Sequence, residues 1–172
     1  FNHLTNYLVA RIDDFRRKCL TPVNKRVVVH AHVGRADICH DVDTLLRAIP
    51  GLEIVDTVFE SGYTCGGSGC GKSPELAARE HAELISRTEA ADADVLVTLY
   101  HGCHAVFAAA EAHGRFRVLN FTDLLVEGLG GVPHVDRLKE FRLLGDWAMI
   151  VDNALPYLAA NGLDIEPEWL KQ

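Results

Sequence analysis

The sequence lacks any apolar run close to the roughly 20 residues that a membrane-spanning helix needs. It shows no signal-peptide pattern, no internal repeat and no low-complexity segment. Positive charge is also scarce, with 17 lysines and arginines against 24 aspartates and glutamates, for a net charge of −7. The lack of a long apolar run leads us to expect no direct membrane span. Because binding to phosphate backbones needs a basic surface, we do not expect nucleic acid as a partner.

The cysteines are too few for a secreted disulfide scaffold, and their odd number would leave one of them unpaired. The chain has five cysteines in 172 residues, an odd number, and we therefore expect reduced thiols in a cytoplasmic protein. Hydrophobic residues make up 48% and charged residues 24%, which indicates a globular domain of ordinary size with its own core. The first residue is Phe1 rather than methionine, so we expect a mature form, a fragment or a part of a longer protein.

The order of the predicted elements indicates an α/β fold. Short runs rich in β-branched residues, typical of buried strands, alternate with segments whose apolar residues recur at helical spacing. Such alternation with short loops predicts a parallel four-stranded sheet with helices on both faces, followed by a C-terminal helical extension. The expected strands lie near residues 26–30, 52–58, 94–99 and 116–120.

The same patterns divide the chain into three parts. Residues 1–22 have apolar positions spaced as in one amphipathic helix and are predicted to be an N-terminal linker helix. Residues 23–130 hold the expected strands and all but one of the cysteines, and form the predicted α/β domain. Residues 131–172 carry helical patterns without a cysteine or histidine cluster, and form the predicted C-terminal extension.

A candidate site is expected past the carboxyl ends of the first three strands. In open parallel sheets these ends meet at one edge, so Ala31, Cys65 and Cys103 should lie at the same edge. Thiolate and imidazole together suit zinc or iron–sulphur chemistry. The candidate metal ligands are Cys65, Cys103, His32, His101 and Cys70, and Gly66 and Gly67 would add backbone N–H groups that point at a cofactor's sulphur.

Not every cysteine is interpreted as a ligand. Cys19 and Cys39 occupy helical positions and are expected to be small buried packing residues. Cys65 and Cys103 lie on glycine-flanked loops at strand ends, where a binding role is favoured. For Cys70 the two interpretations stay open.

Six segments of the chain match, in order and spacing, the motifs of one known family. They are His32-Val33-Gly34-Arg35, Ala48-Ile49-Pro50-Gly51, Cys65-Gly66-Gly67-Ser68-Gly69, Ala93-Asp94-Val95-Leu96-Val97-Thr98, Gly102-Cys103-His104 and Asn120-Phe121-Thr122-Asp123-Leu124-Leu125. In these segments the chain resembles the cysteine-rich (Cys-Cys-Gly) domain family of heterodisulfide reductase and related iron–sulphur oxidoreductases, which include subunits of glycolate and lactate oxidases. The resemblance covers about residues 26–130 and implies a redox subunit that holds an iron–sulphur cluster or zinc. It also implies electron transfer or disulfide or hydroxyacid redox chemistry, with other redox subunits as partners, in the cytoplasm or at a membrane complex reached through those partners.

Three cysteines of that family pattern are missing. Ala31, Thr64 and Tyr100 stand where the pattern has cysteine, and only Cys65 and Cys103 carry over. The alternatives are that other side chains, Cys70, His32, His101 or Cys39, complete the site, or that the domain is a zinc-bound or metal-free assembly scaffold. Two thiolates with two imidazoles would make a tetrahedral zinc site.

A further alternative is nucleotide binding by the segment Gly66 to Ser73, which matches the phosphate-binding pattern G-x-x-x-x-G-K-[ST]. The segment before Gly66 is not a buried strand running straight into the loop, and Pro74 follows Ser73 at once. No predicted strand ends in an aspartate placed for magnesium. We therefore expect no tight nucleotide site.

Overall fold

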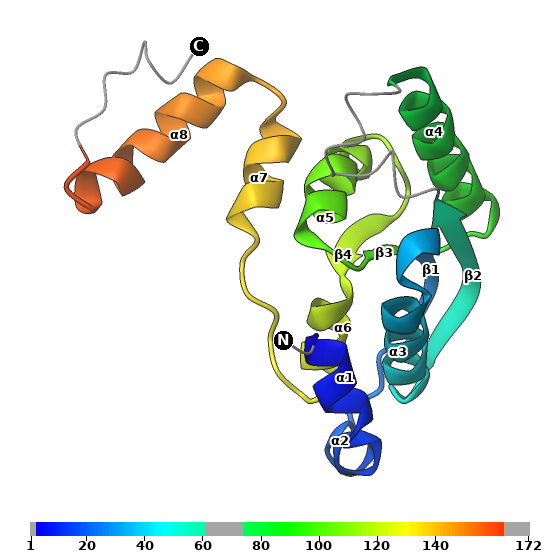
Figure 1. Ribbon diagram of the computed structural model, residues 1–172. Coiled ribbons are helices and arrows are strands. Elements are labelled where there is room, and N and C mark those ends of the chain that lie inside the picture. The colour runs from blue at the N-terminus through cyan, green and yellow to red at the C-terminus, as the bar shows by residue number, and fades with distance from the viewer. Residues whose placement is uncertain (1–2, 61–73, 164–172) are drawn as a thin grey trace. The chain divides into compact units, whose positions relative to one another are not determined.

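A computed structural model describes residues 3–60 and 74–163 (Figure 1). The chain divides into two compact units, Phe1–Val135 and Asp136–Gln172. None of the helices in the described residues is both long and apolar enough to cross a membrane.

The first unit is built on the predicted parallel sheet, which confirms the α/β prediction. Its strands are β1 (Lys25–His32), β2 (Leu52–Glu60), β3 (Val95–Thr98) and β4 (Arg117–Asn120), in the order β2-β1-β3-β4. Every neighbouring pair is parallel. The two central strands, β1 and β3, are largely buried and carry the apolar runs Val27-Val28-Val29 and Val95-Leu96-Val97, as expected of strands covered on both faces.

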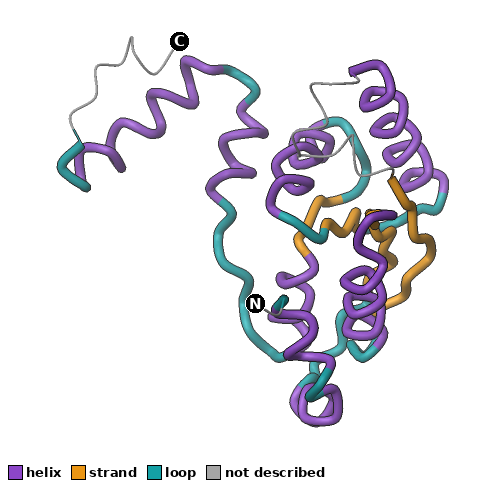
Figure 2. Tube along the Cα trace, viewed as in Figure 1, coloured by secondary structure: helices purple, strands orange, loops and turns teal. Residues whose placement is uncertain are grey.

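Helices cover both faces of this sheet (Figures 1 and 2). The helices α3 (Ala36–Arg47) and α6 (Phe121–Gly128) contribute to one buried cluster, and α4 (Pro74–Ala90) and α5 (His101–Phe107) to the other. Successive side chains of a strand point to opposite faces, and β1 divides its residues accordingly. Val27, Val29 and Ala31 belong to the cluster of α3 and α6, whereas Val28 belongs to the cluster of α4 and α5.

The N-terminal segment forms two short helices, so the prediction of one continuous helix was wrong. The helix α1 (Leu4–Val9) has Ala10 as its C-cap, and α2 (Ile12–Lys18) follows. The break lets each part pack separately. On α1, the Thr5 hydroxyl donates a hydrogen bond to Asp41 of α3 at 3.0 Å, while Phe15 of α2 enters the core.

The start of α6 has a complete capping box. The Asn120 side chain accepts a hydrogen bond from the Thr122 backbone N–H at 3.2 Å, and the Asp123 carboxylate accepts one from the Asn120 N–H at 3.0 Å. Together these bonds satisfy backbone donors that the first helical turn leaves without intrahelical partners. The box therefore sets the direction in which the chain leaves β4.

Replacing this cap should have a measurable cost. We expect Asn120→Ala to lower the free energy of unfolding by about 1 kcal/mol, because the helix loses its side-chain acceptor. Urea denaturation of the full chain measures the change, and Asn120→Asp, which keeps an acceptor, should lie within a few tenths of wild type. Equal stabilities of the alanine and aspartate variants would contradict the capping role.

The second unit contains the helices α7 (Arg137–Leu144) and α8 (Trp147–Ala160), which correspond to the predicted helical extension. Gly145 separates them with φ of +67°, a conformation that favours glycine. Asp146 then caps α8, because its carboxylate accepts a hydrogen bond from the Ala148 N–H at 2.8 Å.

Candidate metal centre

The candidate site lies where the sheet connections change direction. The strands β1 and β3 are neighbours, but α3 follows β1 on one face and α5 follows β3 on the other. Adjacent strands whose connections leave to opposite faces form a topological switch point, and ligands of open α/β sheets bind outside the carboxyl ends of such strands. Here β1 ends in His30-Ala31-His32, and β3 leads through Leu99 and Tyr100 into α5.

Three potential ligands converge at this point. His30, His32 and Cys103 each offer one ligand atom, and these atoms all lie within 4.8 Å of one another. The atoms His32 Nε2 and Cys103 Sγ lie 3.0 Å apart. The two imidazole rings are 4.8 Å apart between centroids and meet edge to face. The arrangement follows from the strand period, because residues 30 and 32 project on the same side of β1, the side that α5 covers.

The surroundings hold these side chains in place. His30 is fully buried and Cys103 is 2% exposed, while His32 is half-buried. The His30 ring packs against Phe107 of α5 at 5.0 Å, and the His32 ring against Tyr100 at 5.1 Å. A site enclosed by aromatic rings strengthens electrostatic interactions inside it, since water is largely excluded.

Tyr100 borders the cluster and remains a neutral hydrogen-bond donor. Burial raises the pKa of its phenol, and the nearby Arg35 guanidinium opposes this shift more weakly. Its hydroxyl oxygen is buried and has no hydrogen-bond partner within residues 3–60 and 74–163. A protonated phenol beside His32 could donate to an oxygen or sulphur atom of a bound group.

The spacing of the three ligand atoms is close to that around one zinc ion. With Zn–N near 2.1 Å and Zn–S near 2.3 Å, the ligand atoms of a tetrahedral site lie about 3.6 Å apart. To bind one ion, the 3.0 Å contact between His32 Nε2 and Cys103 Sγ would have to open slightly. No separation between ligand atoms exceeds 4.8 Å, so none would have to shorten by more than about an ångström, which side-chain rotations can supply. Without metal, the same contact is a hydrogen bond between thiol and imidazole.

The structure brings together two of the five predicted ligands, His32 and Cys103. His101 is the first residue of α5, is exposed and is not part of the cluster. Residues two positions apart on a helix differ by about 200° in direction around its axis. His101 and the buried Cys103 therefore project from nearly opposite sides of α5. The other predicted positions, Cys65, Cys70, Gly66 and Gly67, lie outside the described residues, as does the candidate phosphate loop from Gly66 to Ser73.

Ala31 lies at the same carboxyl edge as the cluster but on the other face of β1. It is fully buried in the cluster of α3 and α6, whereas Cys103 belongs to the cluster of α4 and α5. A cysteine at position 31 would therefore face away from Cys103 if β1 kept this register. In this chain the histidines on either side of Ala31 face Cys103 instead.

His30 and Cys39 matter at this site, although neither was among the five predicted ligands. The signal for His30 was present, because a His-x-His pair on a strand places both rings on one face. Cys39 is buried on α3, as expected of a packing residue, but its sulphur also contacts the backbone of His32. Burial raises the pKa of the Cys39 thiol, so it is neutral at ordinary pH and can donate as well as accept a hydrogen bond.

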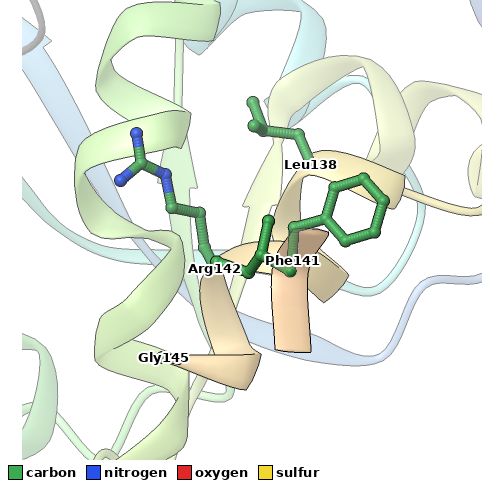
Figure 3. A pocket seen from close by; sticks show the side chains of 5 residues that line it. Leu138, Phe141, Arg142 and Gly145 are labelled. Carbon is green, nitrogen blue, oxygen red and sulfur yellow. The ribbon is translucent and has the colours of Figure 1, made fainter. Parts of the chain in front are cut away.

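Cavities also lie elsewhere in the described residues. One in the second unit, of about 280 Å³, is mainly apolar, with Arg142 and Gly145 at its border (Figure 3). Another in the same unit, of about 320 Å³, is lined by apolar side chains together with Arg137. A cavity of about 270 Å³ lies beside α3 in the first unit, and Cys39 and His40 are among its lining residues. None of these three is lined by a member of the cluster.

Comparisons of the chain with protein-family models, with curated proteins and with solved structures found no match.

Proposed function

We propose that this chain is a metal-binding α/β domain that holds one zinc ion between His30, His32 and Cys103. The observation that carries the proposal is the convergence of two imidazoles and one thiol within 4.8 Å at the switch point of the sheet. Imidazole and thiolate are the side chains that zinc prefers, and the site is enclosed enough to retain an ion. Three protein ligands also leave a fourth position for water or another group.

Zinc fits this donor set better than an iron–sulphur cluster does. Clusters are usually held by four thiolates, and imidazoles replace only some of them in special centres. The described cluster offers one thiol and two imidazoles. An iron–sulphur cluster remains the second candidate, supported by the resemblance of Gly102-Cys103-His104 to the last cysteine motif of the redox family.

The identity of the metal determines the role proposed for the domain. Zinc has no redox chemistry of its own, so a zinc-bound domain would serve as an assembly module within a redox complex. An iron–sulphur cluster would instead carry electrons to or from a disulfide or hydroxyacid substrate. In both cases the proposed partners are other redox subunits, and the proposed compartment is the cytoplasm.

Metal analysis of the purified chain tests the proposal. After anaerobic purification we expect a colourless protein with about one zinc per chain by elemental analysis, because one set of three ligands binds one ion. A brown protein with several irons and acid-labile sulphide would establish the second candidate. A protein that is purified without metal and does not bind added zinc would refute both.

The resemblance also predicts that Cys65 supplies a ligand, and substitution tests this separately. If Cys65 and Cys103 both bind the metal, Cys65→Ser should about halve the sulphur-to-cobalt charge-transfer absorption of the Co²⁺-substituted protein, since one of two thiolates is lost. Absorption equal to that of wild type would show that Cys65 is not a ligand and would leave the site of His30, His32 and Cys103 intact.

A further inference from the structure

The backbone of His32 is held by a thiol on the opposite side of β1 from its ring. The His32 N–H donates a hydrogen bond to Cys39 Sγ at 3.3 Å, and the Cys39 thiol contacts the His32 carbonyl oxygen at 3.5 Å. On the other side, the His32 imidazole meets Cys103 Sγ at 3.0 Å. One histidine thus lies between two cysteines, which α3 and α5 supply from the two faces of the sheet.

This contact occurs where the sheet gives less support to β1. The pairing of β1 with β3 runs from Val27 to Val29 and does not continue to His32. The pairing with β2 does continue, since His32 lies opposite Glu60. Among the described residues, the last part of β1 is therefore paired with a strand on one side only, and the two contacts with Cys39 add a second attachment for the backbone that carries the ligand.

We propose that Cys39 is a positioning residue that fixes His32 for metal binding. The proposal rests on the metal site proposed above and adds to it a residue that does not touch the metal. The orientation of a metal-bound histidine is set by hydrogen bonds around it, and removing such a partner typically lowers metal affinity by about 10–100-fold. In most sites the partner binds the second ring nitrogen, whereas here it binds the backbone of the ligand.

A role limited to filling space makes a different prediction. If Cys39 only fills volume between α3 and the sheet, then valine, of similar size and without a polar atom, should replace it well. If its hydrogen bonds matter, then serine, which keeps a donor and an acceptor, should replace it better than valine or alanine. The two roles therefore predict opposite rankings of serine and valine.

The experiment compares zinc affinities of the full chain by competition with a chromophoric chelator. We expect Cys39→Ser to bind within about threefold of wild type, and Cys39→Val and Cys39→Ala to bind about 10–100-fold more weakly. The matched control is Cys19→Ala, which removes another buried thiol from the same core cluster and should leave the affinity unchanged. Co²⁺ spectra provide a readout that loss of stability does not mimic, because ligand-field bands should shift in Cys39→Ala while the Cys103 charge-transfer band remains.

The outcomes separate this proposal from the one on which it rests. If wild type binds no zinc, the metal site itself is refuted. If wild type binds zinc and Cys39→Val binds equally well with an unchanged Co²⁺ spectrum, only the positioning role is refuted. Should the valine variant fail to fold, serine and alanine decide, and equal affinities of these two would also overturn the positioning role.

Discussion

Cys103→Ser is expected to weaken zinc binding by more than about 100-fold and to leave the chain folded. The reason is that a neutral hydroxyl is a poor zinc ligand compared with a thiolate, so the loss should exceed that for a residue next to a ligand. Serine can still share a hydrogen bond with His32 Nε2, which lies 3.0 Å from the present sulphur. Competition titration measures the affinity, and circular dichroism verifies the fold.

His101→Ala is the matched control for this variant. It changes an exposed residue two positions earlier on the same helix, outside the cluster. Its affinity should equal that of wild type, whereas His30→Gln should lose affinity as Cys103→Ser does, because His30 is the third member of the cluster. Wild-type affinity in Cys103→Ser would contradict the proposed site, and an effect of His101→Ala as large as that of His30→Gln would contradict the proposed ligand set.

Phe107→Ala is expected to lower the free energy of unfolding by about 3–5 kcal/mol, among the largest effects of a single substitution in this chain. Phe107 is 2% exposed, and its ring contacts both His30 and His81, at centroid distances of 5.0 and 4.8 Å. Removing the ring takes away buried apolar area and leaves a cavity between α5 and the sheet. Urea denaturation measures the change.

The control for packing is Leu129→Ala, since Leu129 is an apolar residue that is 47% exposed. A change at an exposed position should stay within about 0.5 kcal/mol of wild type. If Phe107→Ala destabilised the chain by no more than Leu129→Ala, the core between α5 and the sheet would not be packed as described. Phe107→Leu, which keeps much of the volume, should fall between the two.

Sequence patterns predicted the architecture of the first unit well because they depend on local chemistry. Runs such as Val27-Val28-Val29 and Val95-Leu96-Val97 suit strands buried on both faces, and these strands form the centre of the sheet. The pattern was misleading for the N-terminal segment, where apolar spacing continues from α1 into α2 although the backbone turns between them. Helical spacing shows which residues can share a face, but not where packing against other elements ends a helix.

The candidate site could be predicted in part. Cys103 and His32 were recognised because each follows or ends a predicted strand, and parallel strands bring such residues to one edge. His101, which stands only two residues from Cys103 in the sequence, was among the predicted ligands, whereas His30 was not. Closeness in sequence was the weaker guide, because a helix rotates by about 100° per residue and turns His101 away from Cys103.

The sequence by itself determined the strands, the alternation with helices and the division of side chains between the two faces of each strand. These properties follow from steric preferences and hydrophobic periods that act over a few residues. The tertiary structure alone decided that β1 and β3 are neighbours, although 62 residues separate the end of one strand at His32 from the start of the other at Val95. That pairing depends on how the whole sheet buries its surfaces. It places His30 and His32 opposite Cys103, whereas Cys39 reaches His32 from α3, the helix that follows β1 in the chain.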